Sequence, residues 1–270
     1  MNQYDVQAKQ NLRDILEQEW EVDNRAKWED GSPIMTKRIL HVVNKYDLSK
    51  EFPASTLKPS YLVSTFNEID WIYRKMSSNV NDLKGNIWDT WADEKGYIGR
   101  AYGEQVAKAV FGYANQMEFI LNEIKNNPTS RRLIIELWNV DELHLMNLVP
   151  CCHHLNFSVK NGKLHLLLKQ RANDYVTANN FNVVEFALLV HMIARHCGLE
   201  VGVLTHVVTD MHIYNKHEEI AKELLSRPIY QSPKLWVNPE VRDFYEFTSK
   251  DFKLFDYKCG DKIEGLEVAI

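Results

Sequence analysis

Two short runs near the middle of the chain have the apolar patterns of β-strands. Residues 155–159 alternate apolar with polar side chains, and residues 165–171 are more continuously apolar. The connector between them, residues 160–163, carries Asn-Gly, and both of these residues tolerate positive φ. We therefore predict a tight hairpin that brings Cys151 and Arg171, at the open ends of the two strands, close together.

Helical periodicity occurs on both sides of this hairpin. Apolar residues recur every three to four positions in several segments, and we predict helices over residues 4–21, from residue 60 onward, and over 104–126, 183–197 and 215–225. The helix over 183–197 is apolar almost all round and ends at Gly198, as a buried helix with a glycine stop does. Further strands are expected over residues 36–46, 133–138 and 201–208. Without a repeat, linker or low-complexity tract, these elements predict one α+β domain over residues 1–270, with long helices on one side of a sheet.

Composition and charge exclude several classes of function. A chain of 270 residues with 45% hydrophobic residues can form one large domain. The net charge of −5 argues against a general nucleic-acid or membrane-surface binder, and no apolar run reaches transmembrane length. The N-terminus lacks the apolar core of a signal peptide, and the four cysteines lack the spacing of a disulfide framework. We expect a cytoplasmic enzyme, or one of the host cytoplasm if it is phage-encoded.

Several motifs carry a resemblance to a known family. Pro150-Cys151, the Gln-Arg-Ala-Asn-Asp run at 170–174 and Phe181-Asn182, at these spacings, resemble the active-site motifs of thymidylate synthases. The similarity continues in Ser-Arg-Arg at 130–132, in Asp-Met-His-Ile-Tyr at 210–214 and in the final Val-Ala-Ile. The resemblance implies a single catalytic domain in which a mixed sheet packs against long helices and one sheet face forms a two-fold dimer interface. It also implies reductive methylation of dUMP to dTMP by 5,10-methylenetetrahydrofolate, without a metal.

The chemistry of that reaction requires a nucleophile and a proton carrier. Carbon 5 of uracil becomes nucleophilic only when a thiolate adds at carbon 6, and Cys151 is the candidate because cationic neighbours favour a thiolate. Without other information, a single cysteine is more commonly a buried structural residue than a nucleophile. Glu68 lies within a helical pattern, where it is either a solvated edge residue or a half-buried acid with a raised pKa that passes protons near neutral pH. The resemblance assigns catalysis to Cys151, Glu68, Tyr102, Arg171 and Asp174.

Nucleotide recognition is predicted from an amide and several arginines. The Asn182 amide can both donate to and accept from the imide edge of uracil, whereas an aspartate there would suit cytosine. Isolated arginines read as solvated surface, but guanidinium groups bind phosphate monoesters well. The resemblance implies that one subunit supplies Arg25, in a mobile loop, and Arg171, while its partner supplies the paired arginines of the 130–132 motif. The implied dUMP-binding residues are Arg25, Arg131, Arg132, Asn156, Arg171, Asn182, His212 and Tyr214.

The folate side departs from the family in one segment. The resemblance places 5,10-methylenetetrahydrofolate on Lys58, Trp88, Trp91, Leu148, Asp174, Ala178 and Ala269, although two tryptophans three apart also commonly pack a core. Thr-Ala-Asn-Asn at 177–180 replaces Leu-Gly-x-Pro of the family, and Ala178 would be strained if the position needs positive φ. These polar groups could also seat a water that turns the product into 5-hydroxymethyl-dUMP. A dUMP hydroxymethylase is therefore the alternative function.

A metal site and a purely binding role are both less favoured than catalysis. The run of two cysteines and two histidines at 151–154 could suggest a metal site, but adjacent strand residues point to opposite faces and cannot converge on one ion. The same reasoning predicts that Cys151, and not Cys152, faces the nucleotide. A degenerate paralogue with a binding or regulatory role would not be expected to keep every catalytic motif.

Overall fold

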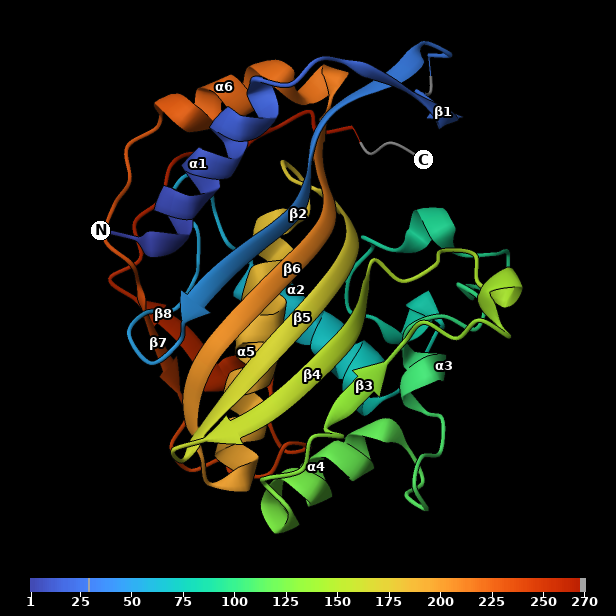
Figure 1. Ribbon diagram of the computed structural model, residues 1–270, viewed down its shortest axis with the longest axis vertical. Coiled ribbons are helices and arrows are strands. Elements are labelled where there is room, and N and C mark those ends of the chain that lie inside the picture. Colours follow the sequence, from blue (N-terminus) through green and yellow to red (C-terminus); the bar gives the residue numbers. More distant parts are fainter. Residues whose placement is uncertain (29, 268–270) are drawn as a thin grey trace.

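The computed structural model describes residues 1–28 and 30–267, and a six-stranded mixed sheet forms its centre (Figure 1). The order of strands across the sheet is β1-β2-β6-β5-β4-β3. β5 and β6 run parallel, and the other neighbouring pairs are antiparallel. The strands are β1 (Glu21–Lys27), β2 (Pro33–Asp47), β3 (Ile134–Glu136), β4 (Cys152–Lys160), β5 (Lys163–Asp174) and β6 (Glu200–Tyr214), with a separate two-stranded sheet of β7 (Lys234–Val237) and β8 (Phe252–Phe255).

Helices pack against one face of the large sheet. Figure 1 shows α5 and α2 behind the sheet and α1 and α6 beside its upper end. The helices are α1 (Gln3–Leu16), α2 (Leu62–Ile69), α3 (Gly103–Val106), α4 (Gln116–Asn126), α5 (Asn179–Cys197) and α6 (Glu218–Ser226), and a π-helical turn (Asp70–Arg74) extends α2. This arrangement confirms the α+β prediction. Among the described residues, no helix has the length and apolar character that a membrane span needs.

The central hairpin has the predicted geometry. Asn161 and Gly162 take φ values of 52° and 72°, and Lys160 pairs with Lys163 across the turn. At the other end of the hairpin, the Arg171 amide donates a hydrogen bond of 2.9 Å to the carbonyl oxygen of Cys151. The Asn-Gly turn sets the register of the hairpin as far as His154, and a one-residue shift between Cys152 and His154 then brings Arg171 to Cys151.

The helix predicted over residues 104–126 is wrong, because the chain breaks it in the middle. α3 ends at Val106 and α4 begins at Gln116. Between them Phe111 and Gly112 take φ values of 49° and 87°, which no α-helix accommodates. Asn115 then starts α4 by accepting a hydrogen bond of 2.7 Å from the amide of Glu118.

The N-terminal region also differs from its prediction. α1 ends at Leu16 rather than near residue 21, because the next residues turn toward the sheet. The segment around Arg25, expected as a loop, is strand β1, which pairs antiparallel with the first residues of β2. On β2 itself, the apolar side chains of Leu40 and Val43 are each 55% exposed.

Candidate active site

A cavity of about 540 Å³ lies between the sheet and the segments that cover it. Elements far apart in the sequence contribute to its wall, including α2, the start of α5 and the ends of β5 and β6. Most of the residues predicted for the site line this cavity: Glu68, Trp88, Trp91, Tyr102, Leu148, Cys151, Arg171, Asp174, Ala178, Asn182, His212 and Tyr214.

Four other predicted residues, Lys58, Asn156, Arg131 and Arg132, do not line this cavity. The Lys58 ammonium donates to the carbonyl of Val176, and burial lowers the pKa of Lys58 to about 8. Asn156 pairs with residues of β3 and β5 in the sheet and is not part of the cavity wall. Arg131 and Arg132 are exposed and line a different cavity of about 730 Å³. The side chain of Arg25, and Ala269 as a whole, lie outside the described residues.

Backbone and side-chain hydrogen bonds hold Cys151 at the cavity wall. The Cys151 amide donates to the Tyr102 hydroxyl oxygen at 3.1 Å. The Arg171 guanidinium donates to the carbonyl oxygens of Val149 at 2.8 Å and Pro150 at 3.1 Å. These contacts place a positive charge beside the peptide that leads into the Cys151 thiol.

The expectation that Cys151 and Cys152 face opposite sides is wrong. Both line the cavity, because Cys151 lies before the first residue of β4 and strand alternation does not apply to this pair. The Cys152 side chain is 5% exposed, and its burial and the neighbouring Glu185 carboxyl raise the pKa of the Cys152 thiol well above its usual value. Burial therefore disfavours the thiolate at Cys152.

Glu68 is a buried acid that accepts a hydrogen bond from a tryptophan. Its side chain is 5% exposed, and the Trp88 indole Nε1–H donates to its Oε2 at 2.9 Å. Burial raises the pKa of Glu68 to about 7, as expected for a carboxyl group inside a helical pattern that is shielded from water. Helical periodicity could not distinguish this position from a solvated helix edge.

Glu68→Gln should remove a pH dependence of folding stability. The folded carboxyl has a pKa of about 7 against 4.5 for an exposed Glu, so the folded state binds the proton more tightly. The stabilisation is fully present below about pH 4.5 and is lost as the pH rises through about 7. Gln can still accept from Trp88. Relative to the variant, the wild-type free energy of unfolding should fall by roughly 2–3 kcal/mol over this range.

Denaturant unfolding of both proteins, at one protein concentration and several pH values, measures this difference. A free-energy difference that stays constant with pH would contradict a proton held by burial.

Aromatic side chains form one wall of the cavity beside Glu68 and Cys151. The Trp88 ring lies 5.7 Å from the Trp91 ring and 4.8 Å from the Tyr102 ring, both edge-on. Tyr102 has a φ of 47°, and the next residue is Gly103, where a Cβ would lie 2.2 Å from the Ser77 carbonyl oxygen. Only glycine permits this close approach, which keeps Tyr102 at the wall.

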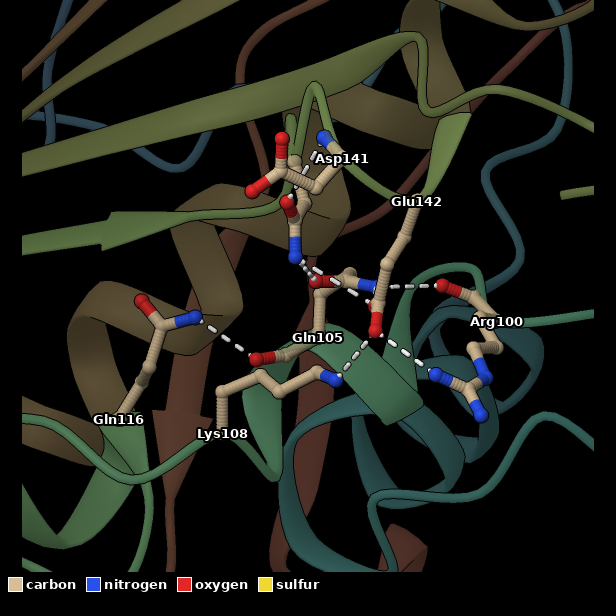
Figure 2. Close-up of polar contacts among 7 residues, drawn as sticks. Arg100, Gln105, Lys108, Gln116, Asp141 and Glu142 are labelled. Atoms are coloured by element: carbon tan, nitrogen blue, oxygen red, sulfur yellow. Dashed lines mark hydrogen bonds and ion pairs between the residues drawn. The ribbon is translucent and has the colours of Figure 1, made fainter. Parts of the chain in front are cut away.

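A polar network ties the segment after Tyr102 to the segment before Cys151 (Figure 2). The Glu142 carboxylate accepts hydrogen bonds of 2.8 Å from Lys108, 2.9 Å from Gln105 and 2.8 Å from Arg100. The hydrogen bond from Lys108 contributes most to lowering the pKa of Glu142, to about 2, so the carboxylate stays charged near neutral pH. The network therefore fixes two chain segments that supply catalytic candidates.

His212 has an unused buried nitrogen at the cavity. Its Nδ1 lies 2.8 Å from the Asp210 carboxylate, which favours a proton on Nδ1. The buried Nε2 then remains an acceptor, and it has no hydrogen-bond partner among the described residues. The ring lies 5.0 Å from that of Tyr214. A ligand hydroxyl would satisfy this nitrogen.

The Asn182 amide has a defined orientation. Gln170 Nε2 donates to Asn182 Oδ1 at 3.1 Å, and the Gln170 oxygen is hydrogen-bonded to His206 at 2.7 Å and accepts from Asn173 at 3.1 Å. Because Gln170 must use its NH₂ group toward Asn182, the Asn182 oxygen lies on that side. Its own NH₂ group is left for other acceptors.

Comparisons with known proteins agree with this arrangement. The thymidylate synthase family model matches residues 6–270. Thymidylate synthase 1 of Bacillus subtilis strain 168 is 41% identical over 281 residues, and the thymidylate synthase of Bacillus phage phi3T is 40% identical, each alignment covering 100% of both chains. The solved structure of thermostable thymidylate synthase A from Bacillus subtilis superimposes with a TM-score of 0.92 at 39% identity, covering 99% of this chain and 100% of that one.

The chain belongs to the thymidylate synthase family. Membership assigns it a methyltransferase activity in dTMP biosynthesis.

The segment that departs from other thymidylate synthases is not strained. Ala178 has a φ of −103°, so the expected conflict with positive φ is wrong. Thr177 and Ala178 line the cavity, as predicted. Asn179 instead donates to the Tyr4 hydroxyl at 2.9 Å, and the Asn180 oxygen accepts from Ser60 at 2.6 Å. The two asparagines therefore stabilise the start of α5 and do not make the cavity wall polar.

Sequence reasoning missed two acids in this thymidylate synthase cavity, Asp23 on β1 and Glu185 on α5. Glu185 lies in α5 and lines the wall together with Glu68. The available signal for Glu185 was a carboxyl residue inside an apolar helix, three positions after Asn182.

The two histidines of the 151–154 run are paired with an acid. His153 and His154 both contact the Glu136 carboxylate. In the described part of the chain, no group of metal-ligand residues is placed to bind an ion.

Proposed function

We propose that the chain converts dUMP to dTMP with 5,10-methylenetetrahydrofolate through a covalent adduct at Cys151. The observation that carries this proposal is the grouping of Cys151, Arg171 and Tyr102 in one cavity with the buried acid Glu68. The Arg171 guanidinium, which contacts the Pro150 carbonyl oxygen next to Cys151, supports a nucleophile at Cys151, and a carboxyl with a pKa of about 7 supports proton transfer near neutral pH.

The reaction follows from this set. The Cys151 thiolate adds to carbon 6 of dUMP, and the enolate that results attacks the methylene carbon of the folate with carbon 5. Tyr102 assists removal of the carbon 5 proton, and elimination of tetrahydrofolate leaves an exocyclic methylene. Hydride from the tetrahydrofolate reduces this methylene to a methyl group, after which dihydrofolate leaves and the thiolate is expelled.

The cavity supports separate places for the two substrates. Asn182 reads the uracil imide, and His212 and Tyr214 hold the sugar hydroxyl, because His212 offers a buried acceptor. Arg171, with Arg25, binds the phosphate. The folate packs on Trp88, Trp91, Leu148 and Ala178, with Asp174 at the pterin and Lys58 and Ala269 further out.

We also propose a homodimer that shares its two sites. Arg131 and Arg132 are exposed and do not line the cavity of their own chain, which supports their use in a partner's site. The exposed Leu40 and Val43 of β2 support burial of a sheet face between two subunits. Asn156 would contribute to dUMP binding only indirectly from its place in the sheet.

The alternative product, 5-hydroxymethyl-dUMP, would need a water at the exocyclic methylene. Its main support was the polar run at 177–180, but Asn179 and Asn180 are turned into the protein interior. Methyl transfer therefore has the better support.

Incubation with dUMP and 5,10-methylenetetrahydrofolate tests the proposal. We expect dTMP by mass spectrometry, with the near-ultraviolet absorbance rise that accompanies formation of dihydrofolate. Turnover without that rise, and a product heavier than dTMP by one oxygen atom, would make the chain a hydroxymethylase.

A further inference from the structure

Glu185 is a buried carboxyl residue that the reaction as described does not use. It lies three positions after Asn182 on α5, so both side chains emerge on the same side of the helix. Its side chain is 2% exposed, yet it lines the cavity. Val184 and Phe186 on either side of it are buried apolar residues. A carboxyl group in such a place costs free energy unless it is neutral or paired.

The groups that face Glu185 do not neutralise it. They are Glu68 from α2, Tyr73 from the π-helical turn and Cys152 from β4, together with the amide of Asn182 from its own helix. In the part of the chain that the structure describes, no ion pair joins Glu185 to a cation. Burial first, and then the Glu68 carboxyl, raise the pKa of Glu185 well above its usual value. These surroundings favour the protonated form of Glu185, which has an O–H to donate.

We propose that Glu185 is a further catalytic residue, whose protonated carboxyl group donates a hydrogen bond toward oxygen 4 of the pyrimidine beside the Asn182 amide. This inference rests on the proposed function, in which the pyrimidine occupies the cavity next to Asn182. Addition of the Cys151 thiolate at carbon 6 places the enolate charge on oxygen 4. A protonated carboxyl group that donates to this oxygen, and is itself almost fully buried, stabilises the charge where it develops.

A purely structural role predicts a different behaviour on substitution. A buried acid without a cation destabilises the folded state, so an apolar residue of similar size should leave the melting temperature unchanged or raise it. For a catalytic donor, the same substitution should lower the rate. Activity and stability are therefore expected to move apart in Glu185→Met.

The experiment compares the full-length wild type with Glu185→Met and Glu185→Gln in the dUMP and 5,10-methylenetetrahydrofolate assay. Glu185→Met should lower kcat roughly 10- to 100-fold, with less than about a threefold change in KM for dUMP, because the enolate forms only after binding. Glu185→Gln keeps a donor and should stay within roughly fivefold of the wild type. Met192→Leu, a volume-conserving change at a buried position of α5 outside the cavity wall, is the control and should change neither rate nor melting temperature.

The pH profile is the readout that a structural role would not move. Glu68, Tyr73 and Cys152 are present in both the wild type and Glu185→Gln. The ratio of the wild-type kcat to the Glu185→Gln kcat therefore reports the effect of the Glu185 carboxyl group. As the pH rises, loss of the Glu185 proton removes the donor and adds a charge, so the wild-type to Gln ratio should fall.

Three results would overturn the inference: unchanged kcat in Glu185→Met, a loss of kcat in proportion to a lower melting temperature, or a ratio that stays flat with pH. A wild type that does not turn over dUMP would contradict the proposed function instead.

Discussion

Cys151→Ser should abolish turnover of dUMP and covalent capture of 5-fluoro-dUMP, whereas Cys152→Ser should keep both. The loss in kcat should be at least roughly 1,000-fold, because no other group replaces the nucleophile. Cys152 lines the same cavity, but burial disfavours its thiolate, while Cys151 follows the peptide that Arg171 contacts. Steady-state rates and intact-protein mass spectrometry of the trapped complex measure the two properties.

Cys152→Ser is the matched control for this change, since it alters the neighbouring thiol by the same atom. Loss of capture in Cys152→Ser, with retention in Cys151→Ser, would reverse the assignment of the nucleophile.

Mixing two inactive variants should restore activity if the sites are shared. One variant lacks Arg131 and Arg132, both replaced by Ala, and the other carries Cys151→Ser. A mixed dimer then has one site with an intact Cys151 from the first subunit and intact arginines from the second. With equal amounts and free subunit exchange, about a quarter of all sites should recover. The arginines line no part of their own chain's cavity, which is the physical reason for this expectation.

The control places all three substitutions on one chain and mixes it with Cys151→Ser. Neither chain in that mixture carries Cys151, so no site has the nucleophile and activity should stay absent. If exchange is demonstrated and the first mixture also stays inactive, each subunit contains a complete site of its own.

Part of the site could be predicted because it depends on local conformation. Asn161 and Gly162 favour the turn through their own tolerance of positive φ, and the turn brings the Arg171 end of β5 to the Cys151 end of β4. The glycine stop at Gly198, with a φ of 69°, ends α5 for the same reason.

Other predictions were wrong where neighbouring segments decide the outcome. The break between α3 and α4 at Phe111 and Gly112 interrupts a pattern that reads as one helix. Cys151 and Cys152 both line the cavity, although simple alternation along a strand would separate them, because Cys151 precedes the first residue of β4.

The sequence by itself determined the family, the α+β class, the hairpin and most of the cavity's polar residues, because these are recorded in short motifs and in backbone preferences of single residues. Only the tertiary structure decided which groups are removed from water. Glu68 and Glu185 are acids within helical patterns, and each becomes a buried, proton-holding group because segments distant in the sequence cover it. Asn179 and Asn180 looked like cavity residues and are not, because Tyr4 and Ser60 bind them from elsewhere in the chain. The desolvation of a side chain depends on all the atoms packed around it. Most of those atoms belong to segments distant in the sequence rather than to the residue's neighbours along the chain.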